Sequence, residues 1–121
     1  MNVGSEWLID ATGCDASALA SAEVLRGLFA RIIAELDLHP LHEPQFHVFP
    51  PPGGITGFVM LTESHLACHT YPEHGVATFN LYCCRPRPEW PWRERLAEIL
   101  GAREVTARAI ERIPEAVPAC R

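Results

Sequence analysis

The sequence predicts an α+β fold, a two-layer sandwich in which a mainly antiparallel sheet carries two helices on one face. Two stretches have the apolar spacing of helices, and most of the remaining chain alternates like strands. The order is strand, helix, four strands, helix, strand, and the four middle strands follow one another through connections of hairpin length, which favour antiparallel pairing. With 121 residues, the chain is predicted to form one domain spanning residues 1–121.

The first third of the chain is predicted to form a strand and a long helix. The strand covers residues 7–12 and ends at Gly13, and Asp15 is a candidate N-cap for the helix that follows. The spacing predicts one helix over residues 19–38, which His39-Pro40 ends. Its apolar face repeats every three or four residues and consists of Leu25, Leu28, Phe29, Ile32, Ile33 and Leu36.

The remaining elements follow from alternation and from turn residues. Four strands are predicted at residues 45–49, 55–61, 65–71 and 76–84. Pro91 is suited to the first turn of a second helix, and Gly101 is suited to its end. Residues 104–110 alternate as a last strand, and the tail after Ile113 is expected to be loose.

Composition and charge exclude several classes of protein. The net charge of −5 and the absence of a basic run argue against a nucleic-acid partner. No apolar stretch reaches the ~20 residues that span a bilayer, and no secretory signal is visible at the N-terminus. The five cysteines are an odd number and include the adjacent pair Cys83-Cys84, which argues against a disulfide framework. We therefore expect a reduced, cytoplasmic protein.

The stretch from Leu61 to Glu73 concentrates reactive groups in a segment patterned like a strand. Polar groups cost free energy when a sheet buries them, so their number here favours a chemical explanation. Strand alternation places His65, Ala67, His69 and Tyr71 on one face, and Leu66, Cys68 and Thr70 on the other. The next strand can bring Cys84 opposite the start of this one. The spacing therefore allows Ser64, His69 and Cys84 to surround one pocket.

Three other interpretations of these residues compete. A zinc site has suitable residue types, although no Cys-x-x-Cys pair is present and neighbouring residues point to opposite faces. Its candidate ligands are His65, Cys68, His69, His74, Cys83 and Cys84. A Cys-His or Ser-His hydrolase is also conceivable, although no Gly-x-Ser-x-Gly elbow is present. Taken singly, Cys68, Cys83, His65 and His74 are best interpreted as ordinary structural residues.

The pattern also resembles a known family, the small prokaryotic S-adenosylmethionine decarboxylase proenzymes. The resemblance is carried by Glu63-Ser64-His65, His69-Thr70, Pro72-Glu73, Gly75 and Cys84. It extends over most of the chain, from about residue 7 to residue 110. Members typically carry Ser, Trp, Thr and Gly at the positions that are occupied here by Thr62, Tyr71, Cys83 and Arg85.

The resemblance implies that the chain cuts itself between Glu63 and Ser64 into residues 1–63 and 64–121. In this scheme the Ser64 hydroxyl attacks the Glu63 carbonyl, and the anionic intermediate requires preorganised donors. Thr56 matches a hydroxyl that supports processing, and His69 matches the group that moves the protons. The residue left at position 64 becomes a covalent pyruvoyl group, the only cofactor that the resemblance implies, and no metal is required.

The same resemblance implies the reaction that follows. The pyruvoyl group forms a Schiff base with a substrate amine and acts as an electron sink while carbon dioxide leaves. Cys84 matches the catalytic proton donor, Glu73 the carboxylate that binds the ribose hydroxyls, and Phe49 the aromatic ring that stacks on adenine. The implied substrate is S-adenosylmethionine, its product serves spermidine and other polyamine biosynthesis, and the implied assembly is a homodimer of cleaved protomers.

Two alternatives remain open from the sequence. Some relatives decarboxylate arginine or ornithine with the same pyruvoyl group. A non-catalytic relative that binds a ligand or a partner subunit is also conceivable, although a decayed site should have lost at least one of Glu63-Ser64, His69 and Cys84.

Overall fold

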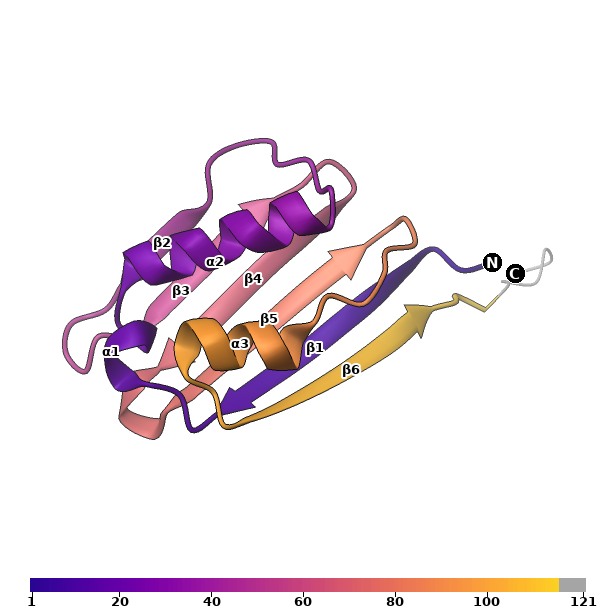
Figure 1. Ribbon diagram of the computed structural model, residues 1–121. Coiled ribbons are helices and arrows are strands. Elements are labelled where there is room, and N and C mark those ends of the chain that lie inside the picture. The colour runs from indigo at the N-terminus through magenta and orange to yellow at the C-terminus, as the bar shows by residue number, and fades with distance from the viewer. Residues whose placement is uncertain (116–121) are drawn as a thin grey trace.

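The protein folds as a six-stranded antiparallel sheet with its helices on one face, as a computed structural model of residues 1–115 shows (Figure 1). The strand order across the sheet is β2-β3-β4-β5-β1-β6. The strands are β1 (Gly4–Thr12), β2 (Gln45–Val48), β3 (Ile55–Met60), β4 (Ser64–Tyr71), β5 (Val76–Cys83) and β6 (Glu104–Arg112). The helices are α1 (Ala16–Leu19), α2 (Ala22–Glu35) and α3 (Trp92–Leu100), with a 3₁₀ turn, η1 (Pro72–His74). The predicted fold class and the predicted succession of strands along the chain are confirmed.

The predicted single helix over residues 19–38 is wrong, because the segment forms two helices. Ser21 is the N-cap of α2, and its hydroxyl accepts a hydrogen bond of 3.2 Å from the Val24 N–H. This cap satisfies one of the free N–H groups at a helix start, so a new helix begins at Ala22. Asp15 occupies the N-cap position of α1, but its side chain makes no capping hydrogen bond. Three helices therefore cover the sheet instead of two.

The C-terminal ends of α2 and α3 are each followed by a residue in a left-handed backbone conformation. The chain leaves α2 before the predicted His39-Pro40 stop, and Asp37 adopts a φ of 54° just beyond the helix. Gly101 has a φ of 68° and ends α3, as its position in the sequence predicted. The predicted loose tail falls largely on residues 116–121, which lie outside the described residues.

The core lies between the helices and one face of the sheet. On the helices, Leu25, Phe29 and Ile32 of α2 and Leu96 of α3 have no measurable exposure. On the sheet, β4 contributes Leu66, Cys68 and Thr70, which confirms the face predicted for them. Burial raises the pKa of Cys68 to about 12, so this thiol stays protonated and serves as a core side chain.

Thr70 is the buried polar residue of this core, and it connects three elements. Its hydroxyl donates to the Leu19 carbonyl at 2.8 Å and accepts from the Ile55 N–H at 2.9 Å. One side chain therefore ties the end of α1 to the β3–β4 ladder.

We expect Thr70→Val to lower the free energy of unfolding by about 1–3 kcal/mol, because the change leaves a buried carbonyl and a buried N–H without partners. Urea unfolding measures the difference. Thr106→Val is the matched control, since Thr106 lies exposed on β6 and should shift stability by less than about 0.5 kcal/mol. Equal losses in the two variants would contradict this role for Thr70.

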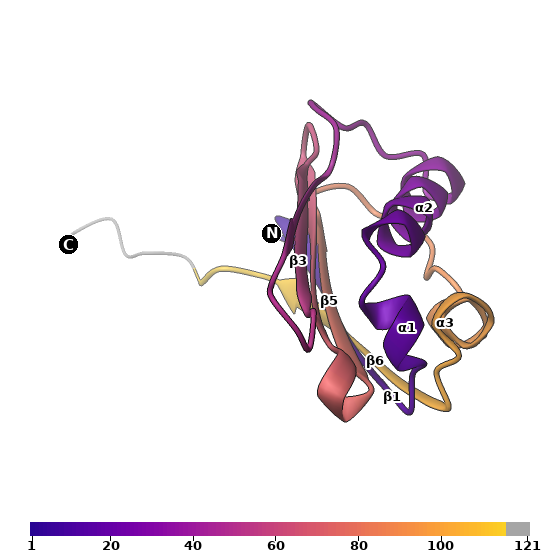
Figure 2. The same ribbon diagram turned by 90° about the vertical axis from the view of Figure 1, so that its left-hand side faces the viewer.

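The other face of the sheet carries no helix (Figure 2). We call it the open face. It exposes apolar side chains among polar ones, including Phe58 at 38%, Met60 at 47% and Ile110 at 46%. These exposed apolar side chains make the open face a surface on which a further layer can pack.

No helix within residues 1–115 is long and apolar enough to cross a membrane.

Candidate active site

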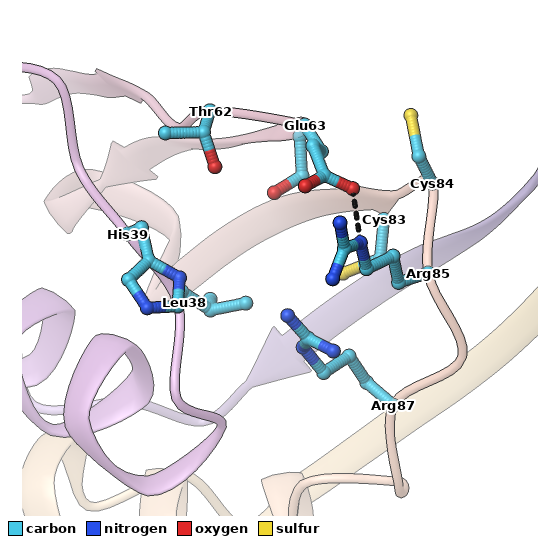
Figure 3. A pocket seen from close by; sticks show the side chains of 9 residues that line it. Leu38, His39, Thr62, Glu63, Cys83, Cys84, Arg85 and Arg87 are labelled. Carbon is cyan, nitrogen blue, oxygen red and sulfur yellow. Dashed lines mark hydrogen bonds and ion pairs between the residues drawn. The ribbon is translucent and has the colours of Figure 1, made fainter.

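The Glu63-Ser64 peptide bond lies at the tight turn between β3 and β4, beside the end of β5. Ser64 pairs with Cys83 in the β4–β5 ladder, and the Leu61 N–H donates to the Ser64 carbonyl at 3.0 Å, closing the turn. A pocket opens at this turn (Figure 3). It is lined by Leu38, His39, Thr62, Glu63, Ser64, Cys83, Cys84, Arg85 and Arg87.

The carbonyl of Glu63 is held by a backbone donor. The Cys84 N–H donates to the Glu63 carbonyl oxygen at 3.1 Å. A donor at this position polarises the carbonyl and stabilises negative charge that develops on its oxygen, which is the task of an oxyanion hole. The Glu63 side chain has a different partner from its carbonyl, because Arg85 Nε donates to its Oε2 at 2.5 Å.

The two adjacent cysteines have different environments. Cys83 is 3% exposed, on the face that the helices cover, and burial raises the pKa of its thiol while the nearby Arg87 acts in the opposite direction. Cys84 follows the last residue of β5 and is exposed at the rim of the pocket. Only the Cys84 thiol is therefore open to a molecule arriving at this turn. The structural interpretation of Cys68 and Cys83 is supported by their burial.

A second pocket lies at the opposite end of β4. Thr56 pairs with His69 across the β3–β4 ladder, and Thr56 Oγ1 lies 3.2 Å from His69 Nδ1, within hydrogen-bond distance. The pocket is lined by Phe49, Pro50, Pro52, Gly54, Ile55, Thr56, His69, Thr70, Tyr71 and Glu73. Four residues that were predicted to act in the reaction therefore line one pocket. They are Phe49, Thr56, His69 and Glu73.

The expectation that Ser64, His69 and Cys84 surround one pocket is wrong within one chain. His69 lies five residues beyond Ser64 along an extended strand, and a strand rises about 3.3 Å per residue, so their Cα atoms are roughly 16 Å apart. Strand alternation correctly predicted the faces of β4, but Ser64 and His69 are separated by an odd number of residues, so their side chains leave the strand on opposite faces. One chain thus holds two half-sites, one around Ser64 and one around His69.

His65 lies between the two half-sites on the open face and belongs to a polar network. Its ring stacks with Tyr82 at a centroid distance of 5.6 Å, and its Nε2 lies 3.2 Å from Asn80 Oδ1. Asn80 in turn donates to Glu6 at 2.8 Å, and this hydrogen bond is the main reason why the pKa of Glu6 lies below its usual value. His65 therefore has a structural partner, as its single-residue interpretation predicted.

Two residues of the Ser64 half-site escaped the sequence-based reasoning. His39 is brought there because the Thr62 N–H donates to its carbonyl at 2.9 Å, and Arg87 because the segment after β5 turns back along the pocket. No local spacing links either residue to Ser64. Within residues 1–115, no group of three or more His, Cys, Asp or Glu side chains is arranged to hold a metal ion, so the zinc ligand set does not assemble there.

Comparison with known proteins matches the whole domain to one family. A family model described as S-adenosylmethionine decarboxylase matches residues 5–113. The S-adenosylmethionine decarboxylase proenzyme of Pelotomaculum thermopropionicum is 33% identical over 117 residues, which cover 94% of this chain and 91% of the relative. That of Acetivibrio thermocellus is 34% identical over 114 residues, covering 91% and 88%. The crystal structure of the adenosylmethionine decarboxylase from Aquifex aeolicus superposes with a TM-score of 0.78 at 28% identity, and covers 97% of each chain.

Proposed function

Because the chain belongs to the S-adenosylmethionine decarboxylase family, we propose that it is a proenzyme that cuts itself at Glu63-Ser64 and then decarboxylates S-adenosylmethionine. The observation that carries the proposal is the hydrogen bond from the Cys84 N–H to the Glu63 carbonyl. It polarises the one carbonyl that a neighbouring serine hydroxyl must attack for the chain to be cut at this point.

Self-cleavage uses backbone and side-chain groups of the protein, with Ser64 and His69 supplied by different half-sites. The Ser64 hydroxyl attacks the Glu63 carbonyl carbon, and the oxygen that becomes anionic is already held by the Cys84 N–H. Collapse of this intermediate breaks the C–N bond and leaves Glu63 esterified to Ser64. Elimination of that ester, with His69 accepting the proton and Thr56 orienting its ring, separates residues 1–63 from residues 64–121.

The residues around position 64 fit a pyruvoyl group. Ser64 is half-buried at the pocket, and the exposed Cys84 thiol adjoins it. When present, the pyruvoyl group supplies a carbonyl that condenses with the substrate amine and draws electrons as carbon dioxide leaves. Cys84 then delivers a proton to the substrate carbon that has lost its carboxylate, which requires a thiol that is both accessible and protonated.

The pocket around His69 suits the nucleoside part of the substrate. The Phe49 ring is 49% exposed at its rim, available to stack on adenine. Glu73 is exposed beside it and can accept hydrogen bonds from the ribose hydroxyls. The chemistry of residue 64 and the recognition of the nucleoside thus fall on different half-sites.

We propose that a second copy of the chain completes each site. Two open faces can stack about a twofold axis that runs between the sheets and perpendicular to β4. This symmetry makes the two β4 strands antiparallel, so the His69 end of β4 in one copy lies over the Ser64 end of β4 in the other. The apolar side chains of the open face, Phe58, Met60 and Ile110 among them, support this packing. A homodimer then has two equivalent sites, each built from both chains.

The test of this function is intact mass spectrometry together with carbon dioxide release. We expect two chains, 1–63 and 64–121, the second lighter by one ammonia than a chain that begins with serine. Ser64→Ala should give one uncut chain. Labelled S-adenosylmethionine, arginine and ornithine are then supplied separately to the cleaved protein, and we expect carbon dioxide from S-adenosylmethionine.

Glu73→Gln sharpens the assignment of the substrate. A charge-assisted hydrogen bond to ribose is worth about 1.5–3 kcal/mol, so kcat/KM for S-adenosylmethionine should fall about 10- to 100-fold. Release from arginine or ornithine alone would transfer the assignment to those amino acids, which have no ribose for Glu73 to bind. Cleaved protein that releases carbon dioxide from none of the three would favour a ligand- or partner-binding role.

A further inference from the structure

We infer that Arg85 and Arg87 supply the counter-charges for residue 63 during self-cleavage. In this inference, Arg85 neutralises the Glu63 side chain, and Arg87 receives the α-carboxylate that leaves Ser64. The inference rests on the proposed self-cleavage and concerns its elimination step.

The two arginines converge on the turn that carries the scissile bond. Arg85 forms an ion pair with Glu63 at 2.5 Å, with 68% and 41% of the two side chains exposed. Arg87 comes from the same segment after β5, and Figure 3 shows its guanidinium group pointing toward Arg85 and the turn. Arg85 thus fixes the side chain of Glu63 from one side while Arg87 approaches from another.

The guanidinium group of Arg87 is incompletely partnered. Its Nε is buried and has no hydrogen-bond partner within residues 1–115, and its Nη1 donates only to the adjacent Pro86 carbonyl at 3.3 Å. A buried donor without an acceptor is costly, and guanidinium groups pair well with carboxylates. Arg87 therefore has unused capacity for an anion inside the pocket that holds Ser64.

The charges balance only after cleavage. Before cleavage, the side chains of Glu63, Arg85 and Arg87 sum to one negative and two positive charges. In the elimination, the Ser64 Cα proton goes to the base, the Cβ–Oγ bond breaks, and its electron pair stays on Oγ. Residue 63 then carries its side-chain carboxylate and a new α-carboxylate, opposite two guanidinium groups. Position 64 is left as dehydroalanine, which tautomerises and takes up water to give pyruvoyl and ammonia.

The product carboxylate is a better match for these arginines than the carboxylate of the substrate. An ion pair to the substrate carboxylate would stabilise the ground state of a group that must lose its charge as carbon dioxide, and would raise the barrier. An ion pair to the Glu63 α-carboxylate forms as charge develops on the leaving group, and therefore lowers the barrier to elimination.

The experiment follows processing itself and needs no decarboxylase assay. Wild type, Arg85→Gln, Arg87→Gln, Arg87→Lys and the control Arg31→Gln are made by cell-free synthesis and sampled over time by intact mass. Arg31 is a suitable control because it also pairs with carboxylates, but on α2 in the helix layer. A parallel aliquot is treated with hydroxylamine, which cleaves an ester between residues 63 and 64 and leaves a serine at the new N-terminus.

We expect Arg87→Gln to form the pyruvoyl chain about tenfold more slowly, the effect of losing about 1.4 kcal/mol of charge stabilisation. Hydroxylamine-sensitive chain should accumulate, because the acyl shift still proceeds. Arg85→Gln should show the same defect more weakly, since its partner is exposed to water. Arg87→Lys, which keeps the charge, should remain within about threefold of wild type.

Two outcomes would overturn the inference. One is pyruvoyl formation in Arg87→Gln at the rate of Arg31→Gln. The other is uncut Arg87→Gln protein that resists hydroxylamine, which would place the defect before the ester forms. Wild type that stays uncut would instead refute the proposed self-cleavage.

Discussion

Chains with His69→Ala are expected to remain uncut on their own, and to be cut when they assemble with chains carrying Ser64→Ala. Within one chain the two half-sites lie at opposite ends of β4, so in the proposed homodimer each complete site takes His69 from one copy and Ser64 from the other. In a mixed dimer, one of the two sites pairs the intact Ser64 of the first chain with the intact His69 of the second.

The two variants are co-expressed with tags of different mass and analysed as intact proteins. Only the His69→Ala chain should be cut, because the other chain has no serine to form the ester. His74→Ala is the control: His74 is exposed in η1, outside both half-sites, and this variant should be cut without help. Absence of any cut His69→Ala chain in the mixture would argue against a site shared between copies. Full cleavage of the His69→Ala variant on its own would show that processing does not require His69.

Cys84→Ala is expected to yield cleaved chains that decarboxylate S-adenosylmethionine about 10²- to 10⁴-fold more slowly, the usual contribution of a general acid. The group proposed to help cleavage at this position is the backbone N–H of residue 84, which donates to the Glu63 carbonyl and which alanine retains. The thiol, in contrast, is lost. This variant should therefore still be cleaved, while its turnover of substrate should be slow.

The neighbouring cysteine is a close control for this experiment. Cys83 adjoins Cys84 in the chain, but its thiol is buried on the helix-covered face, so Cys83→Ala should leave the rate constant of turnover close to wild type. Cys83→Ala should instead lower the free energy of unfolding, because the smaller side chain leaves a small cavity. Turnover that survives in Cys84→Ala, or loss of cleavage there, would contradict the assigned role of the thiol.

Local patterns predicted the elements well where one signal dominated, and less well where two signals competed. Alternation correctly placed Leu66, Cys68 and Thr70 on the same face of β4, which the structure shows to be the buried one, because a strand has a period of two wherever it lies. The apolar repeat from Leu25 to Leu36 begins inside α2. It contains no information on the break at Ser21, because periodicity reports the buried face of a helix and not the capping that begins one.

Residue types and their spacing were enough to identify the family, the fold class and the chemical groups that we propose act at Ser64, His69 and Cys84. These properties depend on residue types and short spacings along one strand. Only the tertiary structure separated Ser64 and His69 into two half-sites and brought Arg87 to the turn at Glu63. Distances along a paired strand and between distant segments depend on how the sheet and its connections pack, which no local period specifies.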